Sequence, residues 1–128
     1  AMDEAIAMQI VGAVTLLIGM KMNIDPKGFN EDIFGKEAHE SALGEMNAMR
    51  MAIGGGVLAI SVINLVCSFT MDDADSMAAL LTATAVGLAI FLATVVAAKF
   101  RGYTDSVPTL PVIVLPILMI VSLVGAYV

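Results

Sequence analysis

The 128-residue sequence has no tryptophan, one cysteine, one histidine and only six basic residues. A single cysteine excludes an internal disulfide. A single histidine, His39, with no second histidine or cysteine at ligand spacing gives no metal motif. The six Lys and Arg residues stand against twelve Asp and Glu, for a net charge of −6, and no basic stripe of the kind that binds nucleic acid is present. These absences argue against disulfide-rich, zinc-binding and nucleic-acid-binding proteins.

Charge of either sign is scarce and apolar residues are abundant. Only 14% of the residues are charged and 59% are hydrophobic, whereas about a quarter of an average soluble domain is charged. Four apolar stretches approach the ~20 residues that a helix needs to cross ~30 Å of hydrocarbon. They cover about 4–24, 46–69, 76–99 and 107–128. We therefore predict an all-α, four-helix transmembrane bundle that forms one domain over 1–128, with an interfacial loop at 25–45.

The basic residues are placed unevenly along the chain. Neither end of the chain nor the loop at 70–76 contains any Lys or Arg. All the basic residues lie in or next to the other two connecting segments; they are Lys21, Lys27, Lys36, Arg50, Lys99 and Arg101. Because Lys and Arg are enriched in loops that stay on the cytoplasmic side, we expect both termini on the trans (lumenal or periplasmic) side. The chain begins with Ala1 and not with Met, and removal of a targeting peptide on that side is one explanation.

Small residues mark two of the predicted helices. Three consecutive glycines lie in the second helix, and alanines recur every four residues in the third; they are Gly54, Gly55, Gly56, Ala85, Ala89 and Ala93. In lipid, small residues allow another helix backbone to approach closely. We expect these positions to be docking faces for a partner.

A few amides and hydroxyls interrupt the apolar helices. Ser61, Asn64 and Ser68 lie on one face of the second helix, and Gln9 is the one strongly polar side chain within the first. An amide in hydrocarbon needs a partner, so we expect this stripe to face another helix. Gln9 and Asn64 are also candidate ligands for a cofactor, for example the magnesium of a chlorophyll, or for a bound lipid or quinone.

The connecting segments give three further expectations. Asp25 to Gly28 is typical of a turn, and the apolar residues that follow, such as Phe29 and Phe34, indicate a segment lying along the membrane interface. The short acidic loop at 70–76 predicts that the second and third helices are antiparallel neighbours. Pro116 within the fourth helix predicts a kink.

Asn47 and Arg50 share a face at the basic end of the second helix, because they are three residues apart. Two interpretations are open. Arg50 is either a snorkelling anchor that pairs with Glu45 or Glu37, or part of a site for a lipid headgroup, a carboxylate or a partner loop.

These residues also carry a family resemblance. Asp25-Pro26-Lys27-Gly28-Phe29 and Phe34-Gly35 precede an Asn-x-x-Arg-x-x-x-Gly-Gly segment that runs from Asn47 to Gly55, and Lys99, Arg101 and Pro108 follow later. The pattern resembles an uncharacterised family of small four-helix membrane proteins found in bacteria and some algae, although the acidic residue that relatives often carry in the fourth helix is missing here. The resemblance implies the fold and no chemistry.

No set of nucleophile, base and acid is present, because His39 stands alone and Cys67 lies within an apolar helix. We therefore expect a protein that is not an enzyme. The leading expectation is an accessory or assembly subunit of a larger membrane complex, such as a photosynthetic or respiratory one in a thylakoid, another organelle membrane or a bacterial inner membrane. The alternative is a small transporter or a protein that binds lipid, quinone or pigment.

Overall fold

The computed structural model describes residues 2–128; Ala1 lies outside the described residues. Its elements are α1 (Glu4–Ile24), α2 (Pro26–Phe34), the 3-10 turn η1 (Glu40–Ala42), α3 (Leu43–Thr70), α4 (Ala74–Phe100) and α5 (Thr109–Tyr127). Four of them, α1, α3, α4 and α5, are long and apolar enough to cross a membrane. The predicted all-α membrane protein with four helices of transmembrane length is confirmed.

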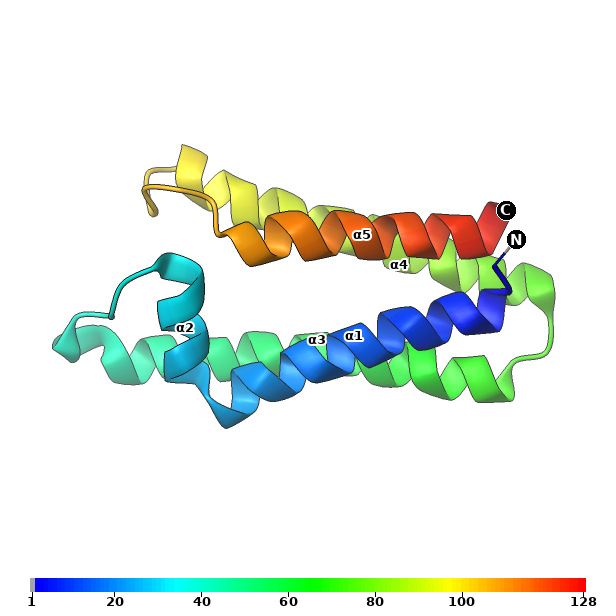
Figure 1. Ribbon diagram of the computed structural model, residues 1–128, viewed down its shortest axis with the longest axis horizontal. Coiled ribbons are helices and arrows are strands. Elements are labelled where there is room, and N and C mark those ends of the chain that lie inside the picture. The colour runs from blue at the N-terminus through cyan, green and yellow to red at the C-terminus, as the bar shows by residue number, and fades with distance from the viewer. Residues whose placement is uncertain (1) are drawn as a thin grey trace.

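The four long helices form two layers (Figure 1). One layer is α1 packed on α3, and the other is α4 packed on α5. The layers meet mainly through α1 and α5, and α3 has little contact with α4. The expectation that the short acidic loop makes α3 and α4 packed neighbours is therefore wrong: the helices run antiparallel but lie in different layers, and α1 and α5 make most of the contact between the layers (Figure 1).

The close contact between α1 and α3 depends on glycine residues, which have no side chain. A Cβ at Gly19 would lie 3.0 Å from the Gly54 carbonyl oxygen, and a Cβ at Gly12 would lie 3.2 Å from that of Ser61. The Ser61 hydroxyl also donates a hydrogen bond to the Gly12 carbonyl oxygen, at 2.7 Å. As lipid provides no hydrophobic drive for helix pairing, such backbone proximity and interhelical hydrogen bonds supply the association.

A close contact between the layers lies near the two termini. Gly125 of α5 is seated on Ala7 of α1, so that even a methyl group at Gly125 would overlap the Ala7 side chain. Met8, Met77 and Leu81 complete a buried cluster with Ala7. At this end the bundle is closed and filled with side chains.

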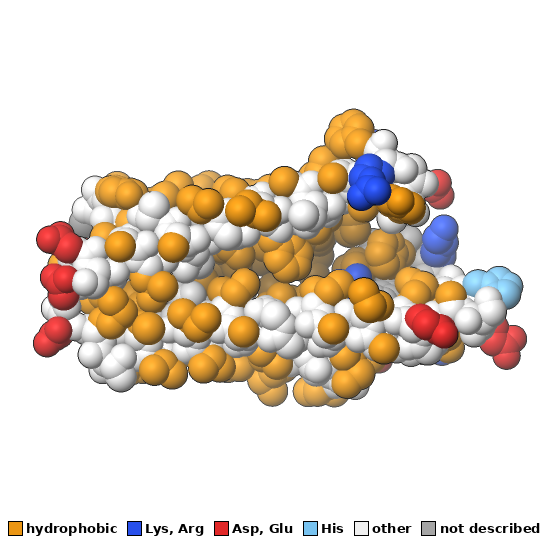
Figure 2. Space-filling view, turned by 180° about the vertical axis from the view of Figure 1, so that it is seen from behind, with side chains coloured by type: hydrophobic (Ala, Val, Ile, Leu, Met, Phe, Trp, Pro, Cys, Tyr) orange, Lys and Arg blue, Asp and Glu red, His pale blue; other side chains and the backbone are white. Residues whose placement is uncertain are grey.

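Charge differs between the two ends of the bundle. In Figure 2 acidic side chains show at both ends, whereas the blue side chains gather at the end opposite the termini and the α3–α4 turn. The alternation of loops between the ends agrees with the topology predicted from the sequence, while the side of the membrane that each end faces stays a prediction.

One local expectation differs from the structure, and the kink expected at Pro116 stays a prediction. The segment that begins at Asp25-Pro26 is not a turn within an interfacial loop but the nine-residue helix α2, with Asp25 as its N-cap and Pro26 in the first turn. Pro26 suits this place because a first-turn residue needs no hydrogen bond from its nitrogen. Helix α5 runs without interruption from Thr109 to Tyr127, through Pro116.

Candidate functional site

An elongated groove of about 660 Å³ lies between the two helix layers, toward the basic end. Figure 2 shows the hollow from one side, with hydrophobic side chains on its walls. Its inner end is formed by Thr15, Leu88 and Leu118, and its mouth by residues of α2, α3 and the α4–α5 loop. All four long helices contribute to it, so the groove exists only in the assembled bundle.

Small residues on both layers keep the groove wide. Gly56 of α3 and Gly87 of α4 both line it, and an added Cβ at either would meet nothing within 4 Å. Here the missing side chains leave room, whereas at Gly12 and Gly19 they permit helix contact. Phe91 of α4 lines the wall and contacts apolar residues of both neighbouring core clusters.

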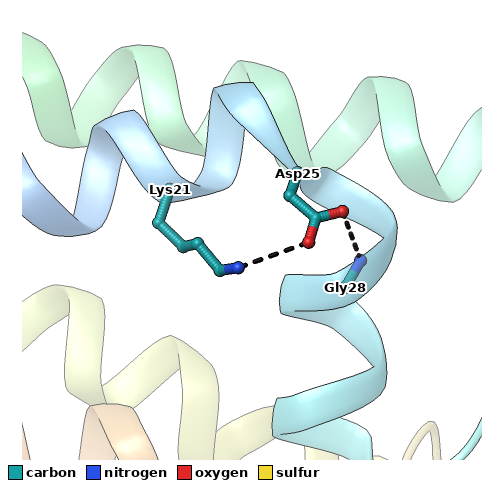
Figure 3. A network of polar contacts seen from close by, with 3 residues as sticks. All are labelled: Lys21, Asp25 and Gly28. Carbon is teal, nitrogen blue, oxygen red and sulfur yellow. Dashed lines mark hydrogen bonds and ion pairs between the residues drawn. The ribbon is translucent and has the colours of Figure 1, made fainter.

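Helix α2 folds back at the mouth and is fixed there by Asp25 (Figure 3). One carboxylate oxygen of Asp25 accepts a hydrogen bond from the Gly28 amide at 3.0 Å, and the other is 3.3 Å from the Lys21 ammonium. These two contacts, the Gly28 bond foremost, hold the pKa of the Asp25 carboxyl below its ordinary value of 3.8. A side chain at Gly28 would overlap that carboxylate, so a larger residue there would displace Asp25 from its capping position.

Two buried side chains attach α2 to the rest of the bundle. Phe29 packs with Met22 and Val57. Asn30 is 5% exposed; its amide nitrogen donates to the Met46 carbonyl oxygen at 3.4 Å, and its amide oxygen accepts from Nε of Arg50 at 2.6 Å. The Arg50 guanidinium also lies over the Phe29 ring, 5.1 Å from its centre.

Arg50 is the one ionisable residue that lines the groove in the described chain. It is half-buried, and no carboxylate of residues 2–128 lies within 4.0 Å of it. The interpretation in which Arg50 pairs with Glu45 or Glu37 is therefore wrong, because Asn30 takes the place of the counter-ion. A guanidinium in this setting stays charged, so the mouth carries an uncompensated positive charge.

A second polar group at the mouth is a hydroxyl without a hydrogen-bond partner among the described residues. The Thr104 hydroxyl, in the loop between α4 and α5, is buried, lines the groove and makes no hydrogen bond within residues 2–128. Buried hydroxyls almost always have a hydrogen-bond partner. Arg50 and Thr104 come from opposite layers, so the polar end of an otherwise apolar groove is defined from both sides.

The structure separates the predicted docking residues. Gly54 is buried against α1, Gly55 is exposed, and Gly56 lines the groove. The alanine ridge is divided in the same way: Ala85 is buried in the bundle, Ala89 is half-buried and Ala93 is exposed. These residues therefore do not form one continuous free face.

The polar stripe of α3 faces the interior, as predicted: Ser61, Asn64 and Ser68 are all buried. The Asn64 amide nitrogen donates to the Ile60 carbonyl oxygen at 3.0 Å and reaches Thr84 Oγ1 on α4 at 3.5 Å, while its amide oxygen has no partner among the described residues. Gln9 is half-buried and makes no hydrogen bond to Asn64. Neither amide lines the groove.

Asn47 lies one turn before Arg50 and is half-buried; its amide oxygen has no hydrogen-bond partner within residues 2–128. It does not line the groove. His39 caps η1 by accepting a hydrogen bond from the Ser41 amide at 3.2 Å. No group of three or more His, Cys, Asp or Glu side chains that could hold a metal occurs in the described part of the chain.

Sequence reasoning missed Asn30 and Thr104. A signal existed for Asn30, because Asp25-Pro26 followed by Phe29-Asn30 and Ile33-Phe34 has helical spacing, with one apolar side that can bury its neighbour. No signal existed for Thr104, whose place at the mouth depends on the path of the loop between α4 and α5.

Comparison of the chain with protein-family models, with curated proteins and with solved structures gives no match. The resemblance to small four-helix membrane proteins therefore stays a prediction.

Proposed function

We propose that the protein is a non-catalytic membrane protein that binds a lipid-like molecule in the groove between its two helix layers. The observation that carries this proposal is the groove itself: about 660 Å³, inside the roughly 300–1,000 Å³ range of small-molecule sites. Its walls are mostly apolar, and of the described lining residues the charged side chain, Arg50, and the residue with an unpaired buried hydroxyl, Thr104, both lie at the mouth. A molecule with a long apolar part and one polar end matches that arrangement.

Occupancy can be tested by filling the groove from a position that has space. Gly56→Phe places a ring in the groove, whereas Gly55→Phe, one residue away, points out of it; neither position has an atom within 4 Å of an added Cβ. Native mass spectrometry after gentle detergent extraction should show a bound small molecule on the unaltered protein and on Gly55→Phe, and loss of it from Gly56→Phe. Equal loading of all three proteins would contradict the proposal.

A second candidate function, a subunit of a larger membrane complex, is favoured by the outer face of α3. Small residues recur there on a lipid-facing surface: Ala48, Ala52, Gly55 and Ala59 are all exposed. Such a surface suits close packing with a further helix. A photosynthetic or respiratory host in a thylakoid or bacterial inner membrane remains the prediction made from the sequence.

The subunit proposal has its own readout. Blue-native electrophoresis of gently solubilised membranes should show the protein in a large complex, and Gly55→Leu should release it as a free species. Migration of the unaltered protein only as a free monomer would rule the subunit proposal out, with no bearing on the groove.

We also propose that the basic end faces the cytoplasmic or stromal side, because all six Lys and Arg residues are at that end or next to it. In a Cys67→Ser background, Lys36→Cys and Asp75→Cys place single thiols at opposite ends. A membrane-impermeant reagent added from the trans side should label Asp75→Cys alone.

A further inference from the structure

We propose that the molecule in the groove is an acidic phospholipid, and that its phosphate binds Arg50 and Thr104 at the mouth. The inference rests on the proposed function, since it assigns the headgroup of the molecule that the groove holds. It is carried by the free Nη donors of Arg50 and the unpaired Thr104 hydroxyl at the mouth, by the depth of Arg50, and by the charge of Arg50, which no carboxylate on the described groove lining balances.

Arg50 has the free donors that a phosphate requires. Its Nε donates to Asn30. Neither Nη1 nor Nη2 donates a hydrogen bond to a described residue, so the donors of both remain available. A guanidinium presents these donors as a planar fork that matches two phosphate oxygens. Asn30 and the Phe29 ring fix the orientation of the fork, so little side-chain freedom is lost when a ligand binds.

Thr104 adds a donor from the opposite layer. Its hydroxyl is buried at the groove and unpaired among residues 2–128, and a hydroxyl can donate to a phosphate oxygen. A group held between Arg50 and Thr104 would join the two layers at the end where they are separated. Neither residue alone indicates this; the two line the same groove from opposite layers.

Arg50 lies at the depth in the membrane at which a lipid headgroup would lie. Helix α3 has 28 residues and is therefore about 42 Å long at ~1.5 Å per residue, longer than the ~30 Å hydrocarbon layer. Arg50 is seven residues from the first residue of α3, Leu43, hence about 10 Å along the axis. A phosphate at Arg50 would lie near the boundary of the hydrocarbon, and the acyl chains would run inward toward Leu118.

Charge selects an anionic headgroup. No Asp, Glu or His of the described chain lines the groove, so the Arg50 charge has no counter-ion there. In addition, the cytoplasmic leaflet, which the basic end is proposed to face, is the one enriched in anionic lipids. A quinone would bring a neutral head and leave Arg50 uncompensated, and a chlorophyll would find no imidazole or amide on the groove walls to ligate its magnesium.

The test uses the absence of tryptophan in the chain, because one introduced tryptophan becomes the sole indole reporter. Phe91→Trp places it on the groove wall, and Leu17→Trp places it at an exposed position outside the groove. Each variant is reconstituted in vesicles of phosphatidylcholine and phosphatidylglycerol with identical dioleoyl chains, of which one lipid at a time carries brominated chains. Quenching by the brominated chains gives the relative affinity of each lipid at each reporter.

At the Phe91→Trp reporter we expect phosphatidylglycerol to bind about fivefold more tightly than phosphatidylcholine, the factor typical of one cationic side chain at the membrane surface. The Leu17→Trp reporter should show no preference. Arg50→Gln should abolish the preference, Arg50→Lys should retain part of it, and Lys99→Gln, which removes a cation outside the groove, should leave it unchanged. Thr104→Val should lower the preference for phosphatidylglycerol about twofold. This second variant tests the site even if Arg50→Gln does not fold.

The possible failures are distinct. A preference that survives both Arg50→Gln and Thr104→Val would overturn the assigned headgroup site, while groove binding itself would stand. Displacement of phosphatidylglycerol by equimolar oleate would overturn the phospholipid in favour of a fatty acid. Equal quenching at the Phe91→Trp and Leu17→Trp reporters by both lipids, with no bound lipid in the mass spectrum, would overturn the groove function and this inference together.

Discussion

The two ends of the bundle contrast in how the helix layers meet. At the end with the termini, Gly125 is seated on Ala7, and Leu81, fully buried, fills the space beside them. At the basic end the layers are apart, and their inner surfaces line a groove of about 660 Å³. Glycine is used both at the closed end and along the groove, but Gly125 brings helices together, whereas Gly56 and Gly87, near the middle of α3 and α4, leave room.

The difference shows what holds a small membrane bundle together. Lipid is as apolar as the side chains, so layers close only where close packing or hydrogen bonds reward contact. The termini end has such contacts and the basic end has few, apart from α2. Helix α2 joins the first layer through Asp25, Phe29 and Asn30, and it borders the open end without filling it.

The strongest way to break the closed end is to enlarge Gly125. Gly125→Leu should destabilise the protein by about 3 kcal/mol, the upper part of the usual range for overpacking, because any side chain there overlaps Ala7. Thermal unfolding in detergent measures the change. Gly55→Leu, in open space, is the matched control and should be near neutral; an equal loss from both would show that the contact at Ala7 is unimportant.

Truncation of a side chain should lower the free energy of unfolding more at the closed end than on the groove wall. Leu81→Ala, at a fully buried position in the closed end, should cost about 2 kcal/mol through lost packing and a residual cavity. Val95→Ala, on the half-buried groove wall, should cost well under ~1 kcal/mol, because the groove already provides space. Reversible unfolding of both variants under identical conditions checks the order, and the reverse order would mean that the groove wall is as well packed as the core.

The attachment of α2 can be loosened by Asn30→Ala. The change removes the bond to the charged Arg50 and the bond to Met46, and hydrogen bonds to charged groups contribute about 1.5–3 kcal/mol. Amide hydrogen exchange over 26–34 should accelerate by at least about tenfold, which corresponds to a loss of ~1.4 kcal/mol in the free energy of local opening of α2. Asp32→Ala, exposed on the same helix, should leave exchange unchanged; similar acceleration by both would place the anchor elsewhere.

The smallest expected effect concerns two aspartate caps, one at each end. Hydrogen bonds to the Asp73 carboxylate, from the Ser76 hydroxyl first and the Ser76 amide second, hold the pKa of Asp73 below 3.8, and bonds from Gly28 and Lys21 do the same for Asp25. Since both folded values are depressed, each cap is fully effective above the unfolded pKa and is lost as pH falls through the lower folded pKa.

The NMR shifts of the Gly28 and Ser76 amides should therefore titrate with midpoints below 3.8, the ordinary value. Asp25→Asn should remove the transition at Gly28 and leave that at Ser76. A midpoint at or above 3.8 for either amide would contradict the corresponding cap.

Much of the architecture is predictable because it is local. The helix expected over 4–24 is observed as Glu4–Ile24, and the one expected over 46–69 as Leu43–Thr70. Buried Ser61 and Asn64 follow from spacing alone, since an amide or hydroxyl in a transmembrane helix is directed to another helix. Helix α2 was missed because Asp25-Pro26 was interpreted as a turn, although the same dipeptide is an N-cap followed by a first-turn proline.

The candidate site was predictable only in part. Arg50 was identified, yet its partner was expected to be Glu45 or Glu37 near it in sequence, and Asn30 lies twenty residues away. Gly54, Gly55 and Gly56 looked alike in the sequence but received three environments, because successive helical residues are about 100° apart around the axis. Which direction faces α1, lipid or the groove depends on how the helices pair.

By itself, the sequence determined that lipid surrounds this chain and that its cations lie at one end, because the length of each apolar stretch and the position of each charge are local quantities. Only the tertiary structure decided that α1 pairs with α3 and not α3 with α4, that the layers close at Gly125 and stay open toward Arg50, and that Thr104 meets the same opening. The reason is that small residues permit a close approach wherever they occur, and the partner that uses each one is chosen by the packing of the whole bundle.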